Sequence, residues 1–137
     1  MNDPRAPGPG PRPVRVFCVE DNALLVMHLQ AIIEGAGHEF AGFAARFDDV
    51  KAAFAETDFD LALVDIDLAD GRTGGSVAQW LQARGRSSLF LTGQEQLTRD
   101  YADVSLGTIG KPVSEEKLRE ALREFGTRRD GPGSPKL

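Results

Sequence analysis

Short apolar runs alternate along the chain with longer stretches in which apolar residues recur every three or four positions. The runs VRVFCV (14–19), LALV (61–64) and LFL (89–91) suit strands that are buried on both faces of a sheet. A weaker run at 39–44 and a run at 104–109 predict two more strands. The chain therefore carries five candidate strands.

Helical spacing predicts helices between and after these runs. It extends over Asn22–Ala36, over Phe47–Phe54, over Val77–Leu81 and onward from Ser114, which is a suitable N-cap with two glutamates behind it. A glycine-rich loop, 71–75, precedes the third of these helices. The segment Gln94–Asp103 has the poorest apolar periodicity, so we expect a short or mobile element there.

Strands that alternate with helices in this way form a parallel sheet with helices on both faces. The pattern predicts an α/β fold with a doubly wound, five-stranded parallel sheet. Ligands of such sheets bind beyond the carboxyl ends of the strands. The residues that follow each strand are therefore the first candidates for a functional site.

The two ends of the chain differ in composition from its middle. Seven of the eight prolines lie outside the middle, and glycines accompany them. We expect residues 1–13 and 127–137 to be disordered tails and residues 14–126 to form one domain.

Composition and charge narrow the class of protein. With 41% hydrophobic and 27% charged residues, the chain has the composition of a soluble globular protein. It contains no apolar run of about 18 residues, so no membrane span is expected, and the cytoplasm is the expected compartment. The first residues lack the apolar stretch of a secretory signal. The single cysteine, Cys18, lies in an apolar run, so we expect a buried thiol and no disulfide. A net charge of −5 argues against nucleic-acid binding.

Polar side chains follow four of the predicted strands. They are Glu20 and Asp21 after the first strand, Asp65 with Asp67 and Asp70 after the third, Thr92 after the fourth, and Lys111 before Pro112 after the fifth. Crowded carboxylates repel one another unless a cation lies among them, and Mg²⁺ prefers a few carboxylates together with water and phosphate oxygens. A carboxylate can also attack phosphorus, while a lysine and a hydroxyl neutralise the phosphoryl oxygens. The set indicates a magnesium-dependent phosphoryl site.

The segments FCVEDN, LALVDIDLADG, FLTG and IGKP together resemble the receiver domains of two-component signalling. The resemblance covers residues 14–125. It implies the CheY-like fold with strand order 2-1-3-4-5. It also implies a single-domain response regulator that takes a phosphoryl group from a sensor histidine kinase or a histidine phosphotransfer protein. Such a protein is a phosphoacceptor switch and not an enzyme with an external substrate.

The resemblance also implies a role for each motif residue. Asp65 would be the phosphoacceptor, and Mg²⁺ would bind Asp21, Asp65, the backbone carbonyl of Asp67 and, mostly through water, Glu20. Lys111 would contact the phosphoryl group and Thr92 would be the switch hydroxyl. Two further family features are a glycine that leaves room for the phosphodonor, here Gly93, and a cis peptide bond before Pro112.

The sequence departs from the usual receiver pattern in two places. Thr108 stands where many receivers carry the aromatic residue whose rotation reports phosphorylation, an absence shared by a subgroup with a Phe-x-Thr-Gly motif such as 90–93. Ala69 replaces a common proline. Because few residues follow the predicted domain, we expect output through contact with a protein target. The apolar surplus of the first helix, which includes Leu24 and Met27, indicates either a docking surface or additional core contact.

Two other functions are compatible with part of the pattern. A degenerate receiver would bind partners without phosphorylation. A haloacid-dehalogenase-like phosphatase would use the VDID segment, with Asp65 as nucleophile and Asp67 as general acid. That motif usually lies in the first strand of a longer chain, whereas here it follows the third predicted strand.

Overall fold

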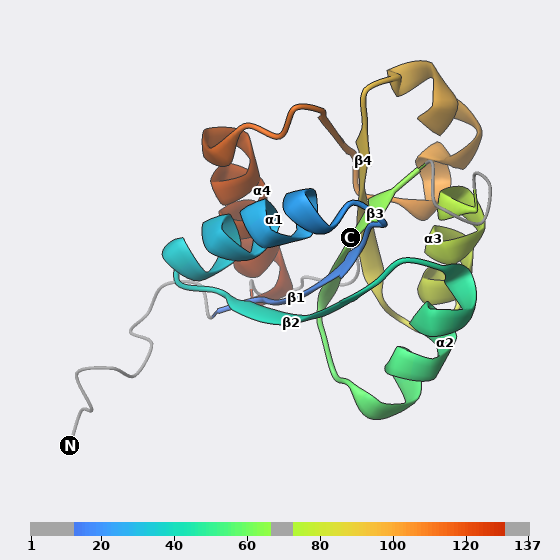
Figure 1. Ribbon diagram of the computed structural model, residues 1–137, viewed down its shortest axis with the longest axis horizontal. Helices are drawn as coiled ribbons and strands as arrows, with labels where there is room; N and C mark the ends of the chain where they lie inside the picture. The colour runs from blue at the N-terminus through green and yellow to red at the C-terminus, as the bar shows by residue number, and fades with distance from the viewer. Residues whose placement is uncertain (1–12, 67–72, 131–137) are drawn as a thin grey trace.

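The computed structural model describes residues 13–66 and 73–130 and contains one five-stranded parallel sheet. Its order, β2-β1-β3-β4-β5, confirms the predicted doubly wound sheet. Helices α1 and α4 cover one face, and α2, α3 and the 3₁₀ helix η1 cover the other (Figure 1). The elements are β1 (Arg15–Val19), α1 (Ala23–Gly35), β2 (Glu39–Ala44), α2 (Phe47–Glu56), β3 (Leu61–Asp65), α3 (Gly74–Gln82), β4 (Ser87–Thr92), η1 (Glu95–Val104), β5 (Thr108–Gly110) and α4 (Glu115–Asp130).

Each face of the sheet has its own apolar core, because successive residues of a strand point to opposite faces. The first core lies against α1 and α4 and includes Leu61 and Leu63 of β3. The second core lies against α2, α3 and η1 and includes Ala62 and Val64. Cys18 lies in the first core with no exposed surface, as predicted, and burial raises the pKa of its thiol to about 12. The central strands are thus fixed on both faces, which holds their carboxyl ends in place.

The region between β4 and α4 differs from the expectation. The fifth strand was predicted over 104–109, but β5 covers only Thr108–Gly110. Val104 instead ends η1 and packs on the second core, and Gly107 has a φ of 155°, which interrupts an extended strand. The weak helix candidate is a 3₁₀ helix divided by a kink at Tyr101.

Two helix boundaries are also corrected. The predicted glycine-rich loop ends earlier, because Gly74 and Gly75 already belong to α3. Helix α4 continues to Asp130, four residues beyond the domain boundary predicted at residue 126. The Thr127 hydroxyl donates to the carbonyl of Arg123, a contact within the helix that apolar spacing does not reveal. The remainder of both predicted tails, 1–12 and 131–137, lies outside the described residues.

Helix α1 resolves the question raised by its apolar surplus. Val26 is buried with the core residues of the helix, but Leu24 and Met27 are 77% and 65% exposed. Part of the surplus therefore faces away from the core.

Within the described residues, no helix is both long and apolar enough to span a membrane.

Candidate functional site

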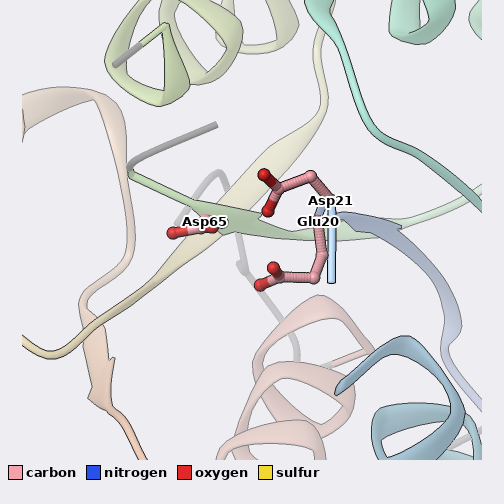
Figure 2. A group of neighbouring side chains, drawn as sticks. All are labelled: Glu20, Asp21 and Asp65. Atoms are coloured by element: carbon pink, nitrogen blue, oxygen red, sulfur yellow. The ribbon is translucent and has the colours of Figure 1, made fainter. Parts of the chain in front are cut away.

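Three of the predicted acidic residues, Glu20, Asp21 and Asp65, meet at the carboxyl ends of β1 and β3 (Figure 2). Val19 pairs with Val64 in the parallel register, so the next residues, Glu20 and Asp65, leave neighbouring strands side by side. Asp21 follows directly and is exposed, whereas Glu20 and Asp65 are buried. The register of two central strands therefore assembles the three carboxylates.

Glu20 is buried and held by a backbone hydrogen bond. Its side chain is 1% exposed, and the backbone N–H of Asn22 donates a 3.1 Å hydrogen bond to Oε2. Burial is the main cause that raises the pKa of Glu20 from 4.5 to about 7, and the charge of Asp65 adds to it. The Asn22 hydrogen bond and Lys111 lower the pKa and offset part of this rise.

Lys111 connects the two buried carboxylates. Its Nζ lies 3.1 Å from Oε1 of Glu20 and 3.4 Å from Oδ1 of Asp65. Burial lowers the pKa of this lysine, but the combined attraction of Asp65 and Glu20 outweighs burial and leaves the pKa above 10.5. The ammonium group is thus charged at neutral pH and placed beside Asp65. The peptide bond between Lys111 and Pro112 is cis, as predicted.

Thr92 ends β4 at the same edge of the sheet. It follows Leu91, the register partner of Asp65, and its own partner is Gly110, the residue before Lys111. Its buried hydroxyl donates to the carbonyl of Gln94 at 3.2 Å and accepts from the Gln94 N–H at 2.9 Å. The side chain is therefore near the acidic group in the sheet, but its hydrogen bonds go to the chain that leads into η1.

The acidic group has the composition and spacing of a cation site. One oxygen each of Glu20, Asp21 and Asp65 lies within 4.8 Å of the other two. Oε1 of Glu20 is buried and, among the residues that the structure describes, accepts no hydrogen bond of ordinary geometry, although the Lys111 ammonium lies 3.1 Å away. A hard divalent cation takes carboxylate oxygens as ligands and would satisfy this acceptor. The three residues can therefore hold a divalent metal ion.

Two supporting residues were missed in the sequence. Asn22 both bonds Glu20 through its backbone and caps α1 through Oδ1, which accepts from the N–H groups of Leu24 and Leu25. Its position before an apolar helix was the available signal. Gly74 packs on the acceptor strand, since a Cβ there would lie 2.3 Å from the carbonyl oxygen of Asp65. No sequence pattern reveals that approach.

Three of the residues singled out in the sequence lie outside the described residues, and a fourth has free space around it. Asp67, whose carbonyl was predicted to complete the metal ligands, and Ala69 and Asp70 lie outside the described residues. Gly93 is exposed, and a Cβ there would meet no atom of the described residues within 4 Å. As far as the structure describes the chain, the space beside Gly93 is therefore open.

Comparison with curated proteins finds similarity to a regulator and to a sensor protein. Phyllosphere-induced regulator PhyR of Methylorubrum extorquens is 42% identical over 60 residues, which are 43% of this chain and 22% of PhyR. Sensor protein GacS of Pseudomonas syringae pv. syringae is 29% identical over 123 residues, which are 83% of this chain and 14% of GacS. The chain thus matches less than a quarter of the length of either relative.

Comparison with solved structures and family models covers more of the chain. The receiver domain of Erythrobacter litoralis PhyR is 26% identical with a TM-score of 0.74, over 91% of this chain and 97% of that one. A CheY-like receiver domain from Methylobacillus flagellatus is 17% identical with a TM-score of 0.74, over 83% and 99% of the two chains, and shows the fold alone. The model of the response regulator receiver domain matches residues 16–123. The chain belongs to the response regulator receiver domain family.

Proposed function

We propose that this protein is a response regulator that accepts a phosphoryl group on Asp65 in the presence of Mg²⁺. The observation that carries the proposal is the contact of Lys111 with both Glu20 and Asp65, within a group of three carboxylates that can share one cation. Family membership supports the same role for the site.

The chemistry follows from the groups around Asp65. An oxygen of this carboxylate forms a bond to phosphorus while the bond between phosphorus and the imidazole nitrogen of the donor breaks. The nitrogen keeps the electron pair of that bond. Bound Mg²⁺ would supply positive charge to the phosphoryl oxygens and relieve the repulsion among the carboxylates.

The residues of the chain supply the remaining interactions. The Lys111 ammonium is charged and already lies 3.4 Å from Asp65, so it can neutralise a phosphoryl oxygen without a large movement. Thr92 can donate to another oxygen once its hydroxyl turns away from Gln94. The backbone carbonyl of Asp67 is proposed as the further metal ligand.

The partners belong to the same proposal. The phosphoryl donor is a sensor histidine kinase or a histidine phosphotransfer protein in the cytoplasm, and the output is contact with a protein target. The protein acts as a phosphoacceptor switch whose only reactions are its own phosphorylation and dephosphorylation. Its relation to PhyR and to GacS, a sensor protein, supports a place in this type of signalling.

Intact-mass spectrometry after incubation with Mg²⁺ and acetyl phosphate tests the proposal. We expect the mass of one phosphoryl group to be added to the wild-type chain, and no addition to Asp65→Asn or in EDTA. Addition that persists in Asp65→Asn would reject Asp65 as the acceptor. Complete absence of addition would instead favour a degenerate receiver that binds partners without phosphorylation. Asp65 lies in β3 of a receiver-family chain, so the phosphatase alternative has lost its support.

A further inference from the structure

The second core contains an aromatic residue close to the place where Thr108 breaks the receiver pattern. Thr108 pairs with Phe90 in the register of β4 and β5. The ring of Phe90 meets the ring of Tyr101 edge to face, with 6.3 Å between the centroids. Tyr101 comes from η1, so this aromatic group approaches β4 from a helix and not from β5.

Tyr101 rests on a glycine that no larger residue could replace without displacing the ring. A Cβ on Gly75 would lie 2.3 Å from Cζ of Tyr101 and 2.4 Å from both Cε atoms. The preceding residue, Gly74, makes an equally close approach to the backbone of Asp65. Two consecutive residues of α3 therefore contact the acceptor strand on one side and the Tyr101 ring on the other.

The hydroxyl of Thr92 is hydrogen-bonded to Gln94, the residue before η1. It holds Gln94 by two hydrogen bonds, and the carbonyl of Gln94 also accepts the N–H of Leu97, the first backbone hydrogen bond of the helix. A threonine hydroxyl has one proton to donate. It cannot donate to Gln94 and to a phosphoryl oxygen at the same time, so a turn toward the phosphoryl group releases the carbonyl of Gln94.

The rest of η1 is interrupted by a kink and is only partly buried. It consists of two 3₁₀ segments that are joined at Tyr101, whose φ and ψ of −123° and 19° are non-helical. The apolar side chains Leu97, Tyr101 and Val104 are only partly buried against the second core. At the far end, the side-chain amide of Gln82 in α3 donates to the carbonyl of Asp103 at 2.9 Å, which anchors the helix there.

We propose that Tyr101 reports the phosphorylation state of Asp65: Thr92 releases Gln94 on turning to the phosphoryl group, and η1 then shifts the Tyr101 ring on Gly75. This inference rests on the function proposed above. It gives the protein an aromatic relay although position 108 carries a threonine.

Fluorine NMR tests the relay in the full chain. Because the sequence contains one tyrosine, 3-fluorotyrosine labels Tyr101 alone. With Mg²⁺ and acetyl phosphate, we expect a second resonance whose share equals the phosphorylated fraction measured by intact mass. An unchanged resonance in phosphorylated protein would overturn the relay and leave the phosphoacceptor function intact. Absence of phosphorylation would reject both.

Variants separate a relay from a mere change near the label. Thr92→Val keeps the shape but loses the hydroxyl, and we expect the Tyr101 resonance of its phosphorylated form to stay at the resting position, whereas Thr92→Ser restores the change. Gly75→Ala should displace the ring, and so the resonance, already without phosphorylation. The matched control is Gly35→Ala, where a Cβ meets no atom within 4 Å, and its spectra should equal those of wild type. A wild-type response in Thr92→Val or Gly75→Ala would contradict the proposed route.

Discussion

Replacement of Glu20 by glutamine measures how strongly the buried carboxylate destabilises the fold when no cation is bound. The side chain is 1% exposed, and burial raises its pKa from 4.5 to about 7. One pKa unit corresponds to about 1.4 kcal/mol, so ionisation of Glu20 lowers the free energy of unfolding by about 3 kcal/mol. Glutamine keeps the shape without the charge. We expect metal-free Glu20→Gln to be more stable than wild type by about 3 kcal/mol at about pH 8.

The raised pKa of Glu20 determines the pH range in which the stability of the variant differs from that of wild type. As the pH rises from 4.5 to about 7, the unfolded chain loses the Glu20 proton while the folded chain retains it. The contribution of Glu20 to stability is therefore fully present below this window and is lost across it. Urea denaturation in EDTA, followed by circular dichroism at about pH 4.5 and about pH 8, should show that the difference between variant and wild type opens only at the higher pH.

A charge control and a metal control complete the test. Glu124→Gln makes the same change at an exposed position of α4 and should alter the free energy of unfolding by less than about 0.5 kcal/mol. Mg²⁺ should stabilise wild type more than Glu20→Gln, because it neutralises the charge that the variant lacks. If Glu20→Gln were less stable than wild type at the higher pH in EDTA, burial would not be the dominant effect at Glu20 and the reasoning would be refuted.

Further substitutions test the site and its support. Asp21→Asn should weaken Mg²⁺ binding and slightly stabilise the metal-free protein, since it removes one of three crowded charges; an unchanged Mg²⁺ shift in thermal melts would argue against Asp21 as a ligand. Ser88→Ala should raise the free energy of unfolding by about 1 kcal/mol in urea titrations, because the buried Ser88 hydroxyl has no hydrogen-bond partner within residues 13–66 and 73–130; a loss of stability would reveal a partner. Gly74→Ala should lower it by at least about 2 kcal/mol, because its Cβ would meet the carbonyl oxygen of Asp65, whereas Gly35→Ala should change it by less than about 0.5 kcal/mol; equal effects would contradict the close approach.

The central strands were predictable because their signal is local and strong. LALV is continuously apolar, and β3 occupies Leu61–Asp65 with every residue buried. Asp65 directly follows this run, so its position at the end of a strand could be predicted. Parallel topology then places it at the edge of the sheet where ligands bind. Glu20 and Lys111 could be placed beside it for the same reason, since the carboxyl ends of parallel strands meet at one edge of the sheet.

The region from η1 to β5 could not be predicted in the same way. The sequence pattern predicts Val104 as the first residue of a strand, but Val104 packs against the second core and ends η1. Likewise, Gly74 and Gly75 read as loop residues, and only the packing of α3 against Asp65 and Tyr101 shows why they are glycines within a helix. Tertiary contacts decided these positions, and such contacts leave no periodic pattern in the sequence.

The pKa of Glu20 and the hydrogen bonds of Thr92 also depend on the folded structure. A sequence shows that Glu20 follows a strand, but its exposed fraction of 1% and its contact with Lys111 arise only in the folded sheet. Thr92 was predicted as a switch hydroxyl, and its resting contact with Gln94 depends on the turn into η1. The sequence therefore predicts which residues form the site, but not the pKa of Glu20 or the hydrogen bonds that Thr92 makes before phosphorylation.

Reductive trapping of the acyl phosphate is the most direct test of Asp65 as phosphoacceptor. Borohydride reduces an aspartyl phosphate to homoserine, which peptide mass spectrometry locates in the sequence. After treatment with Mg²⁺ and acetyl phosphate, we predict homoserine at position 65 and at no other acidic position, and none when EDTA replaces Mg²⁺. Homoserine at Asp21 or another aspartate, 5-hydroxynorvaline at Glu20 or another glutamate, or a yield independent of Mg²⁺ would contradict the account.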